Sequence, residues 1–336
     1  IFTMHLKFNL PKKILSWYDN NKRNLPWRVS KNSPKKLYYR LLSEFMLQQT
    51  QVKTVIPYFN KFTKKFKTLQ NLSKSKEKEI LKLWEGLGYY RRARNLLASS
   101  KLLVKEYNSK LPYEIKEIKK LPGVGEYTAN ALLGLVHNKP TIAIDGNVKR
   151  VFARVLNKKE LKIDFEKFIE LNKKNLFSTK RNSDFVEALM EFGALICKPK
   201  DPKCSICNLK KMCKYFNSSN KIKNIKKKMI KNKNYDVFCY INKKKEMALT
   251  KKNKLGFLSE FNLPQIKETN LKVRKASWKF LSNYKNSISN IKLNINLYYK
   301  FSNKIPSNFN WYSINKNKEF IPSFTKKIFK QISILF

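Results

Sequence analysis

The sequence predicts two domains: a mainly α-helical N-terminal region followed by a small α+β domain. Apolar residues recur at the 3.6-residue helical period from Lys12 to Ile196. The stretch 217–234 then contains seven lysines, no acid and little periodicity, as expected of a linker. Beyond it, segments such as IKLNINLYYKF alternate apolar and polar residues like strands. The predicted divisions are a domain at 1–216, a basic linker at 217–234 and a domain at 235–336.

Charge and composition indicate a nucleic-acid partner. The formal net charge of +50 favours a polyanion. Enrichment in Lys, Asn and Ile with only 8 Gly also fits drift towards AT-rich codons, so the charge is supporting evidence only. Neither a signal peptide nor a membrane span is expected, and four clustered thiols plus a lone Cys239 fit a reducing compartment. We therefore expect a soluble cytoplasmic protein without a membrane partner.

A helix is predicted over LYYRLLSEFMLQQT, in the first third of the chain. Its apolar residues share one side, and Glu44 lies about 20° outside Leu37 on a helical wheel, with Gln48 on the same border. Apolar neighbours that half-cover a carboxyl group disfavour its charged form, which suits a general acid. Taken by itself, the pattern also fits an ordinary glutamate at the edge of a helix face.

Two turns in the helical region carry residues suited to DNA contact. In LWEGLGYYRRARNL, a Gly-x-Gly turn exposes Tyr89 ahead of three arginines, which suits base stacking and phosphate contact. In LPGVG, Gly123 and Gly125 form a tight hairpin between two helices. Free backbone amides at the start of the second helix can bind a phosphate without reading sequence.

A second carboxylate follows twenty residues after that hairpin. Asp145 precedes a basic helix that begins at Gly146–Asn147, where it would act as an N-cap. A carboxylate held at a helix start is well aimed and expected to remain ionised. Further along, Glu187 and Glu191 lie one turn apart on a helix that leads into a cysteine loop.

The cysteine loop places four thiols within seventeen positions, separated by six, two and five residues. Both structural zinc and an iron–sulfur cluster accept four thiolates. Zinc ribbons usually carry two CxxC pairs, whereas this loop has one such pair and two outlying cysteines. The four residues are Cys197, Cys204, Cys207 and Cys213.

These motifs together resemble the MutY-type adenine DNA glycosylases of the endonuclease III superfamily. The string LPWR…LSEFMLQQTQVKTVIPYF, the LPGVG hairpin with its following Asp, and the cysteine loop carry the resemblance, from about Leu10 to Cys213. Farther on, LGFLSEFNLPQ resembles a turn in the family's Nudix-like C-terminal domain. The catalytic Nudix box is missing, so no pyrophosphatase activity is expected.

The resemblance implies a helix-hairpin-helix glycosylase fold, a [4Fe–4S] cluster on the four cysteines, and a flipped adenine as substrate. It implies that Glu44 protonates adenine at N7, that Asp145 stabilises the cationic sugar, and that Tyr127 and Asn147 hold the sugar and Asp145. The base- and DNA-binding residues that it implies are Arg28, Gln48, Gln49, Tyr89, Gly123, Gly125, Glu187 and Ser289.

Two departures bear on the branch of the family. Tyr127 stands where bifunctional relatives have a nucleophilic lysine, so strand cleavage is not expected. Ser289 stands between Ile288 and Asn290, where the family has Phe and His around the serine that recognises 8-oxoguanine. We therefore expect a monofunctional, monomeric enzyme of the bacterial nucleoid that excises adenine from duplex DNA opposite 8-oxoguanine or guanine.

Two alternatives compete with this prediction. An endonuclease III-like glycosylase with lyase activity is disfavoured by Tyr127 and by the long C-terminal domain. A non-catalytic DNA-binding relic is disfavoured because Glu44, Asp145 and all four loop cysteines are intact.

Overall fold

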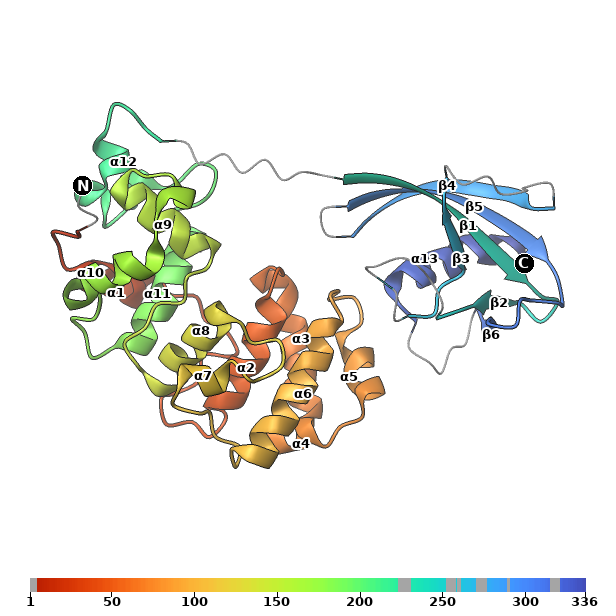
Figure 1. Cartoon of the computed structure of the whole chain (residues 1–336), viewed down its shortest axis with the longest axis horizontal. Helices are drawn as coiled ribbons and strands as arrows, with labels where there is room; N and C mark the ends of the chain where they lie inside the picture. Colours follow the sequence, from red (N-terminus) through yellow and green to blue (C-terminus); the bar gives the residue numbers. More distant parts are fainter. Residues whose placement is uncertain are drawn as a thin grey trace. The chain divides into compact units, whose positions relative to one another are not determined.

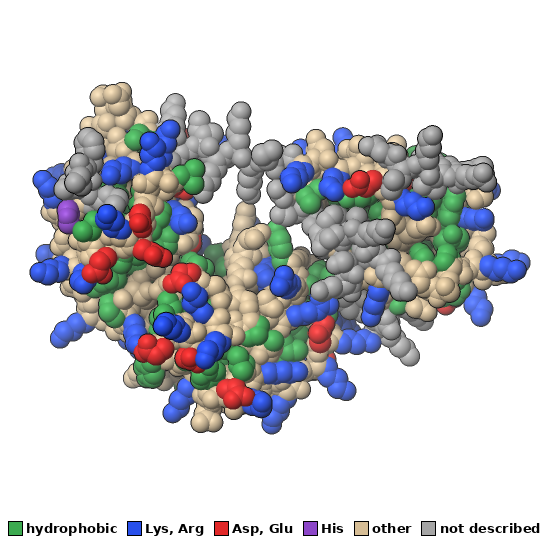
Figure 2. Space-filling model, viewed as in Figure 1, with side chains coloured by type: hydrophobic (Ala, Val, Ile, Leu, Met, Phe, Trp, Pro, Cys, Tyr) green, Lys and Arg blue, Asp and Glu red, His purple; other side chains and the backbone are tan. Residues whose placement is uncertain are grey.

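A computed structural model describes residues 5–222, 231–251, 258, 261–269, 277–288, 291–314 and 321–336. The chain divides into two compact units, Ile1–Ile225 and Lys226–Phe336 (Figure 1). Within the described ranges, no helix combines the length and the apolar character needed to cross a membrane. Lys and Arg side chains are spread over the face of each unit drawn in Figure 2, rather than gathered in one stripe.

The first unit is helical, as the periodicity predicted. Its helices are α1 (Leu10–Asn21), α2 (Lys36–Leu47), α3 (Val52–Lys65), α4 (Leu69–Ser73), α5 (Glu77–Trp84), α6 (Arg91–Glu106), α7 (Ile115–Ile118), α8 (Glu126–His137), α9 (Gly146–Leu156), α10 (Phe165–Leu176), α11 (Asn182–Leu195) and α12 (Lys214–Asn217). The predicted helix, LPGVG hairpin and helix correspond to α7, a turn and α8.

Helix α11 is the central element of one half of this unit, because it packs against α1, α8 and α9. Its Phe192 ring meets Trp17 of α1 edge to face, with centroids 5.1 Å apart. Phe152 of α9 and Phe168 of α10 are fully buried in the same cluster. These contacts fix α8, which follows the hairpin, and α9, which follows Asp145, against one common support.

Helix α2 packs against α3, α6 and α8 and is buried more completely than its sequence pattern predicted. Four consecutive residues, Ser43 to Met46, are all less than 6% exposed. Glu44 is therefore enclosed instead of half-covered at the border of an apolar face. Three surrounding helices bury sides of α2 that a single-helix pattern assigns to solvent.

The second unit contains a mixed sheet and a helix. Among the described residues its elements are β1 (Lys231–Ile241), β2 (Glu246–Leu249), β3 (Gln265–Glu268), β4 (Lys279–Ile288), β5 (Ile291–Phe301), β6 (Asn310–Ser313) and α13 (Ser323–Ile332). The sheet order is β4-β5-β1-β2-β6, with β3 paired to β1, and only β1 and β5 among the paired strands run parallel. An α+β unit was predicted, and β5 coincides with the predicted strand IKLNINLYYKF.

One face of β5 is apolar as the alternation predicted, although only its centre is covered. Leu293, Ile295 and Leu297 are buried, whereas Phe301 at the strand end is 53% exposed. Strand β1 begins at Lys231, inside the stretch 217–234 that was predicted as linker. Most of LGFLSEF lies outside the described residues.

Candidate active site and cysteine pocket

Glu44 lies inside the helical unit, on α2. Its side chain is buried, and burial raises its pKa to about 7, while Arg40 and Tyr127 act in the opposite direction. The charges of Glu187 and Asp145 also contribute to this increase. A carboxyl group that titrates near neutrality can hold a proton and release it, which is what a general acid requires.

Asp145 caps the N-terminus of α9, which confirms the predicted N-cap. Its Oδ1 accepts a hydrogen bond from Val148 N at 2.7 Å, and its Oδ2 accepts one from Asn147 Nδ2 at 2.8 Å. Burial raises the pKa of Asp145, and these two hydrogen bonds limit the increase. The sequence pattern did not indicate this burial, because N-cap residues usually lie at the surface.

Tyr127, in the first turn of α8, interacts electrostatically with both Glu44 and Asp145. Burial raises its pKa well above 10, and the neighbouring Glu44 and Asp145 charges contribute to that increase. Its hydroxyl group meets Met190 Sδ of α11 at 3.3 Å. Glu44, Tyr127 and Asp145 thus influence one another's protonation, although Glu44 and Asp145 are 101 residues apart in the sequence.

Glu187 of α11 is held by cations and a phenol. Its carboxylate accepts hydrogen bonds from Arg40 Nη1 at 2.6 Å and from Tyr18 Oη at 2.8 Å, and it forms an ion pair with Arg28 Nε at 2.9 Å. Burial would raise the pKa of Glu187, but Arg40 and Arg28 lower it below its ordinary value. The pKa of Glu187 is therefore lowered, whereas that of the neighbouring Glu44 is raised.

Glu191 and Arg23 complete this network, and sequence reasoning did not assign them a role. Glu191 Oε1 accepts hydrogen bonds from Arg23 N at 2.7 Å and from Arg23 Nε at 3.0 Å. The other carboxylate oxygen is hydrogen-bonded to Arg28, which also bonds to the Arg23 carbonyl. The spacing of Glu187 and Glu191, one turn apart in a buried helix, was the available signal.

Of the two glycines in the LPGVG hairpin, only Gly123 is required by the backbone. Gly123 has φ +81°, and a Cβ there would lie 2.5 Å from Asn95 Nδ2. Gly125 has φ −94° and ψ −175°, an extended conformation open to any residue, which corrects the expectation that both glycines serve a tight backbone. Gly125 supplies no side-chain cap to α8. Gln48 Nε2 reaches Gly123 O at 3.5 Å.

Gln49 and Tyr89 share an uncommon backbone conformation. Their φ angles are +56° and +49°, in the left-handed region that non-glycine residues rarely adopt. Both side chains are exposed, Tyr89 by 41%. Ser289, the predicted reader of the opposite base, lies outside the described residues.

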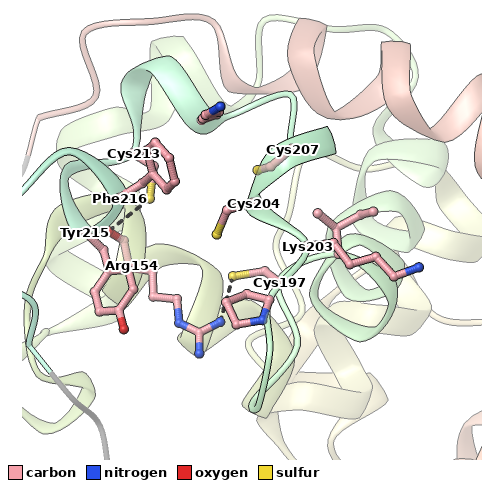
Figure 3. A pocket seen from close by; sticks show the side chains of 11 residues that line it. Arg154, Cys197, Lys203, Cys204, Cys207, Cys213, Tyr215 and Phe216 are labelled. Carbon is pink, nitrogen blue, oxygen red and sulfur yellow. Dashed lines mark hydrogen bonds between the residues drawn. The ribbon is translucent and has the colours of Figure 1, made fainter.

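The four loop cysteines line one pocket of about 30 Å³ (Figure 3). Arg154 of α9 lies at its edge, where Nη1 donates to Cys197 Sγ at 3.3 Å, and the Cys213 thiol approaches Arg154 O at 3.5 Å. Burial raises the pKa of the Cys207 thiol to about 11 and also raises that of Cys213. Thiolates in this pocket therefore require a compensating positive charge, such as metal ions.

The four cysteine thiols form a donor set that a structural zinc ion and an iron–sulfur cluster both accept. One tetrahedral zinc ion would draw four sulfurs to about 3.8 Å from one another, given Zn–S bonds of about 2.3 Å. Within the described part of the chain, no three Cys, His, Asp or Glu side chains are placed to hold one metal ion. Four cysteine sulfurs around one shared space fit a metal centre held by four thiolates.

Arg150 joins the cysteine loop to the capped end of α9. Its guanidinium donates to Cys197 O at 2.7 Å, to Gly193 O at 2.7 Å and to Asn147 Oδ1 at 2.8 Å. Asn147 in turn donates to Asp145. Sequence reasoning missed Arg150, although its position three residues after Asn147 on the same helix was a usable signal.

Comparison with known proteins identifies the helical unit first. The model of the HhH-GPD superfamily of base excision DNA repair proteins matches residues 42–174. A solved structure of a thermostable thymine-DNA glycosylase is similar, with a TM-score of 0.54 and 28% identity over 62% of this chain and 94% of that one. The first unit thus has the fold of the helix-hairpin-helix DNA glycosylases.

Curated relatives show which kind of DNA glycosylase this chain resembles. The adenine DNA glycosylase of Buchnera aphidicola subsp. Baizongia pistaciae is 38% identical over an alignment of 325 positions that covers 90% of this chain and 90% of that one. That of Buchnera aphidicola subsp. Schizaphis graminum is 40% identical over 62% of this chain and 60% of that one. The Mus musculus protein is 38% identical over 60% of this chain and 41% of that one. The chain therefore belongs to the adenine DNA glycosylase family.

Gly193 should be necessary for the position of Asp145. A Cβ at Gly193 would lie 2.9 Å from Asn147 O and 3.0 Å from Asn147 C, so α9 itself would have to shift. We expect Gly193→Ala to destabilise the protein by about 1–3 kcal/mol and to slow base excision at least tenfold. Thermal unfolding and single-turnover excision measure the two effects.

Gly134→Ala is the matched control, because its added methyl group meets the Val186 side chain, 2.7 Å away, instead of a backbone. A side chain can move without displacing a helix. Equal losses of excision in the two variants would contradict this account of Gly193.

Proposed function

We propose that this chain is a monofunctional adenine DNA glycosylase of base excision repair that removes adenine opposite 8-oxoguanine or guanine. The observation that carries the proposal is the enclosed Glu44, with its pKa near 7, beside the capped carboxylate Asp145. Family membership supports DNA N-glycosylase activity.

The chemistry requires an acid and an anion. Adenine must leave the base stack before its glycosidic bond can be reached. Glu44 then donates its proton to adenine N7, the bond to the sugar breaks, and the electron pair leaves with the neutral base. Asp145 stabilises the resulting cationic sugar, and water completes hydrolysis to an abasic site. Asn147 keeps Asp145 aligned through its hydrogen bond.

The base pocket is proposed around Glu187. Arg28 and Arg40 hold its carboxylate in place and anionic, so that it can accept a hydrogen bond from the amino group of a flipped adenine. Gln48, Gln49 and Tyr89 are proposed to fill the space that the base leaves. The amides after Gly123 and Gly125 are proposed to bind a phosphate.

The cysteine pocket is proposed to hold a [4Fe–4S] cluster on Cys197, Cys204, Cys207 and Cys213. Such a cluster would cross-link the loop. Arg150 and Arg154 connect that loop to α9 through its carbonyl groups. The residues of the loop thereby support the position of Asp145 without touching the reacting atoms.

The second unit is proposed to be a Nudix-like domain in which Ser289 reads the opposite base. Its mixed sheet, with the parallel pair β1 and β5 and the helix α13, is compatible with that assignment. The proposed partner is duplex DNA bound by a monomer, in the cytoplasm of a bacterium and close to its nucleoid.

Glu44→Gln should retain DNA binding and lose base excision by a hundredfold or more, because an amide cannot donate the required proton. For the unmodified protein, the fraction of protonated Glu44 falls as pH rises through about 7, so the single-turnover rate should fall over the same range. Rates measured from pH 5.5 to 8.5 provide the check. Excision by Glu44→Gln at the normal rate would place the acid elsewhere.

Anaerobically purified protein should be yellow-brown and contain about four iron and four sulfide per chain. Cys204→Ser should lower the iron content. Cys239→Ala, which alters a buried thiol of β1 outside the loop, should leave it unchanged. Elemental analysis that found stoichiometric zinc instead would contradict the cluster.

Excision should leave an abasic strand that breaks only after heat or alkali. Tyr127 is a phenol and cannot form the Schiff base that precedes strand cleavage. Borohydride should trap little covalent complex on the unmodified protein, and Tyr127→Lys should trap more. Strong trapping on the unmodified protein would favour the endonuclease III-like alternative.

Removal of residues 235–336 should narrow the affinity gap between adenine opposite 8-oxoguanine and adenine opposite guanine. A single base-edge contact from Ser289 is worth about 1–3 kcal/mol of discrimination. Dissociation constants at one fixed salt concentration measure the gap, and Ile288→Phe with Asn290→His should widen it. A ratio that truncation leaves unchanged would show that the second unit does not read the opposite base.

A further inference from the structure

Arg92, near the start of α6, is buried behind two exposed turns. The residue is only 7% exposed, and burial lowers its pKa to about 10. Among the described residues it forms no ion pair, and its hydrogen bonds go to backbone carbonyl groups. A cation placed this way serves to hold backbone rather than to neutralise an acid.

The carbonyl groups belong to two separate turns. One Nη atom donates to Phe45 O at 3.2 Å, to Met46 O at 2.7 Å and to Gln48 O, at the C-terminal end of α2. The other donates to Leu87 O at 3.2 Å and to Gly88 O at 3.1 Å, in the turn before α6. One planar group therefore links segments about forty residues apart.

Two of these carbonyl groups immediately precede Gln49 and Tyr89, the residues with positive φ. The Gln48 carbonyl lies in the peptide plane joined to Gln49, and the Gly88 carbonyl lies in the plane joined to Tyr89. The orientation of that plane sets φ of the following residue, and both following residues have positive φ. Such a conformation is energetically unfavourable for a residue with a side chain and persists only where its surroundings impose it.

Side-chain stacking strengthens the link. The Arg92 guanidinium lies 5.3 Å from the ring centroid of Tyr89 and 5.3 Å from that of Trp84. Trp84 Nε1 also donates to Gly88 O at 3.0 Å. Planar stacking and a five-donor fork are properties of arginine that lysine lacks.

We propose that Arg92 is a positioning residue that fixes the Gln49 and Tyr89 turns as one rigid double wedge for entry into the base stack. The proposal rests on the proposed function in taking Gln49 and Tyr89 as the residues that enter DNA. Because Arg92 fixes the backbone of both turns in the DNA-free protein, the turns need no further ordering when a base is flipped. Loss of Arg92 should leave the acid and the carboxylate intact and impair the separation of bases.

The test compares Arg92→Met and Arg92→Lys with Lys105→Met. Lys105 lies on the same helix, forms an ion pair with Glu106 at 3.0 Å, and its loss removes one positive charge as well. Amide hydrogen exchange of the DNA-free protein measures how well the backbone of the two turns, 47–50 and 86–90, is protected. Fluorescence of 2-aminopurine beside the target adenine reports unstacking, and single-turnover excision at saturating protein reports catalysis.

We expect Arg92→Met to raise exchange at least tenfold in both turns while α8 and α11 keep their protection. Unstacking fluorescence should fall by half or more and excision at least tenfold, whereas affinity for a duplex that already carries an abasic analogue should change less than threefold. Arg92→Lys keeps the charge and most of the side-chain volume, and should show the same losses. Lys105→Met should behave as the unmodified protein.

Unchanged exchange in either turn, or normal unstacking by both Arg92 variants, would overturn the proposal. If Arg92→Met fails to fold, Arg92→Lys decides the outcome. The exchange experiment uses no DNA, so it judges the link between the turns independently of the activity. Failure of the unmodified protein to excise adenine would instead count against the proposed function.

Discussion

Hydrogen bonding by buried guanidinium groups is the interaction on which the helical unit depends. Arginine is scarce in this chain, with ten residues among 73 basic ones, and nine of the ten lie in the first unit. Arg28 and Arg40 hold Glu187, Arg150 holds the end of α9 and the cysteine loop, and Arg92 holds two turns. Lysine cannot replace a planar fork that bonds several fixed acceptors at once. Composition drift that favours lysine therefore affects the surface, while these interior positions require arginine.

Buried charge also explains how two neighbouring carboxyl groups acquire different states. Glu44 and Glu187 both lie in the interior, and burial raises the pKa of each. Glu187 contacts two guanidinium groups directly and its pKa falls below the ordinary value, whereas Glu44 interacts with Arg40 at longer range and its pKa rises. The pKa values of the two carboxyl groups are thus shifted in opposite directions, and the raised value belongs to Glu44, the proposed acid.

The sequence predicted much of this site because its chemistry is tied to local patterns. Asp145 was recognisable as an N-cap, the α2 helix as the carrier of Glu44, and the four cysteines by spacing, and the structure brings Glu44, Tyr127 and Asp145 into electrostatic contact. The resemblance to a known family supplied roles that periodicity alone left open. The full burial of Glu44 was not predictable, since it arises from three helices that meet around α2 and not from α2 itself.

Residues that act through others were missed for a physical reason. Gly193 matters because its missing Cβ lets α11 approach the Asn147 backbone, and Arg150 matters because it joins three segments. Neither property produces a periodic pattern in the sequence around Gly193 or Arg150. Tertiary proximity decides both, so only the arrangement of α9, α11 and the cysteine loop reveals them. The position of one carboxylate, Asp145, consequently depends on the crossing of α9 with α11 and on the cysteine loop.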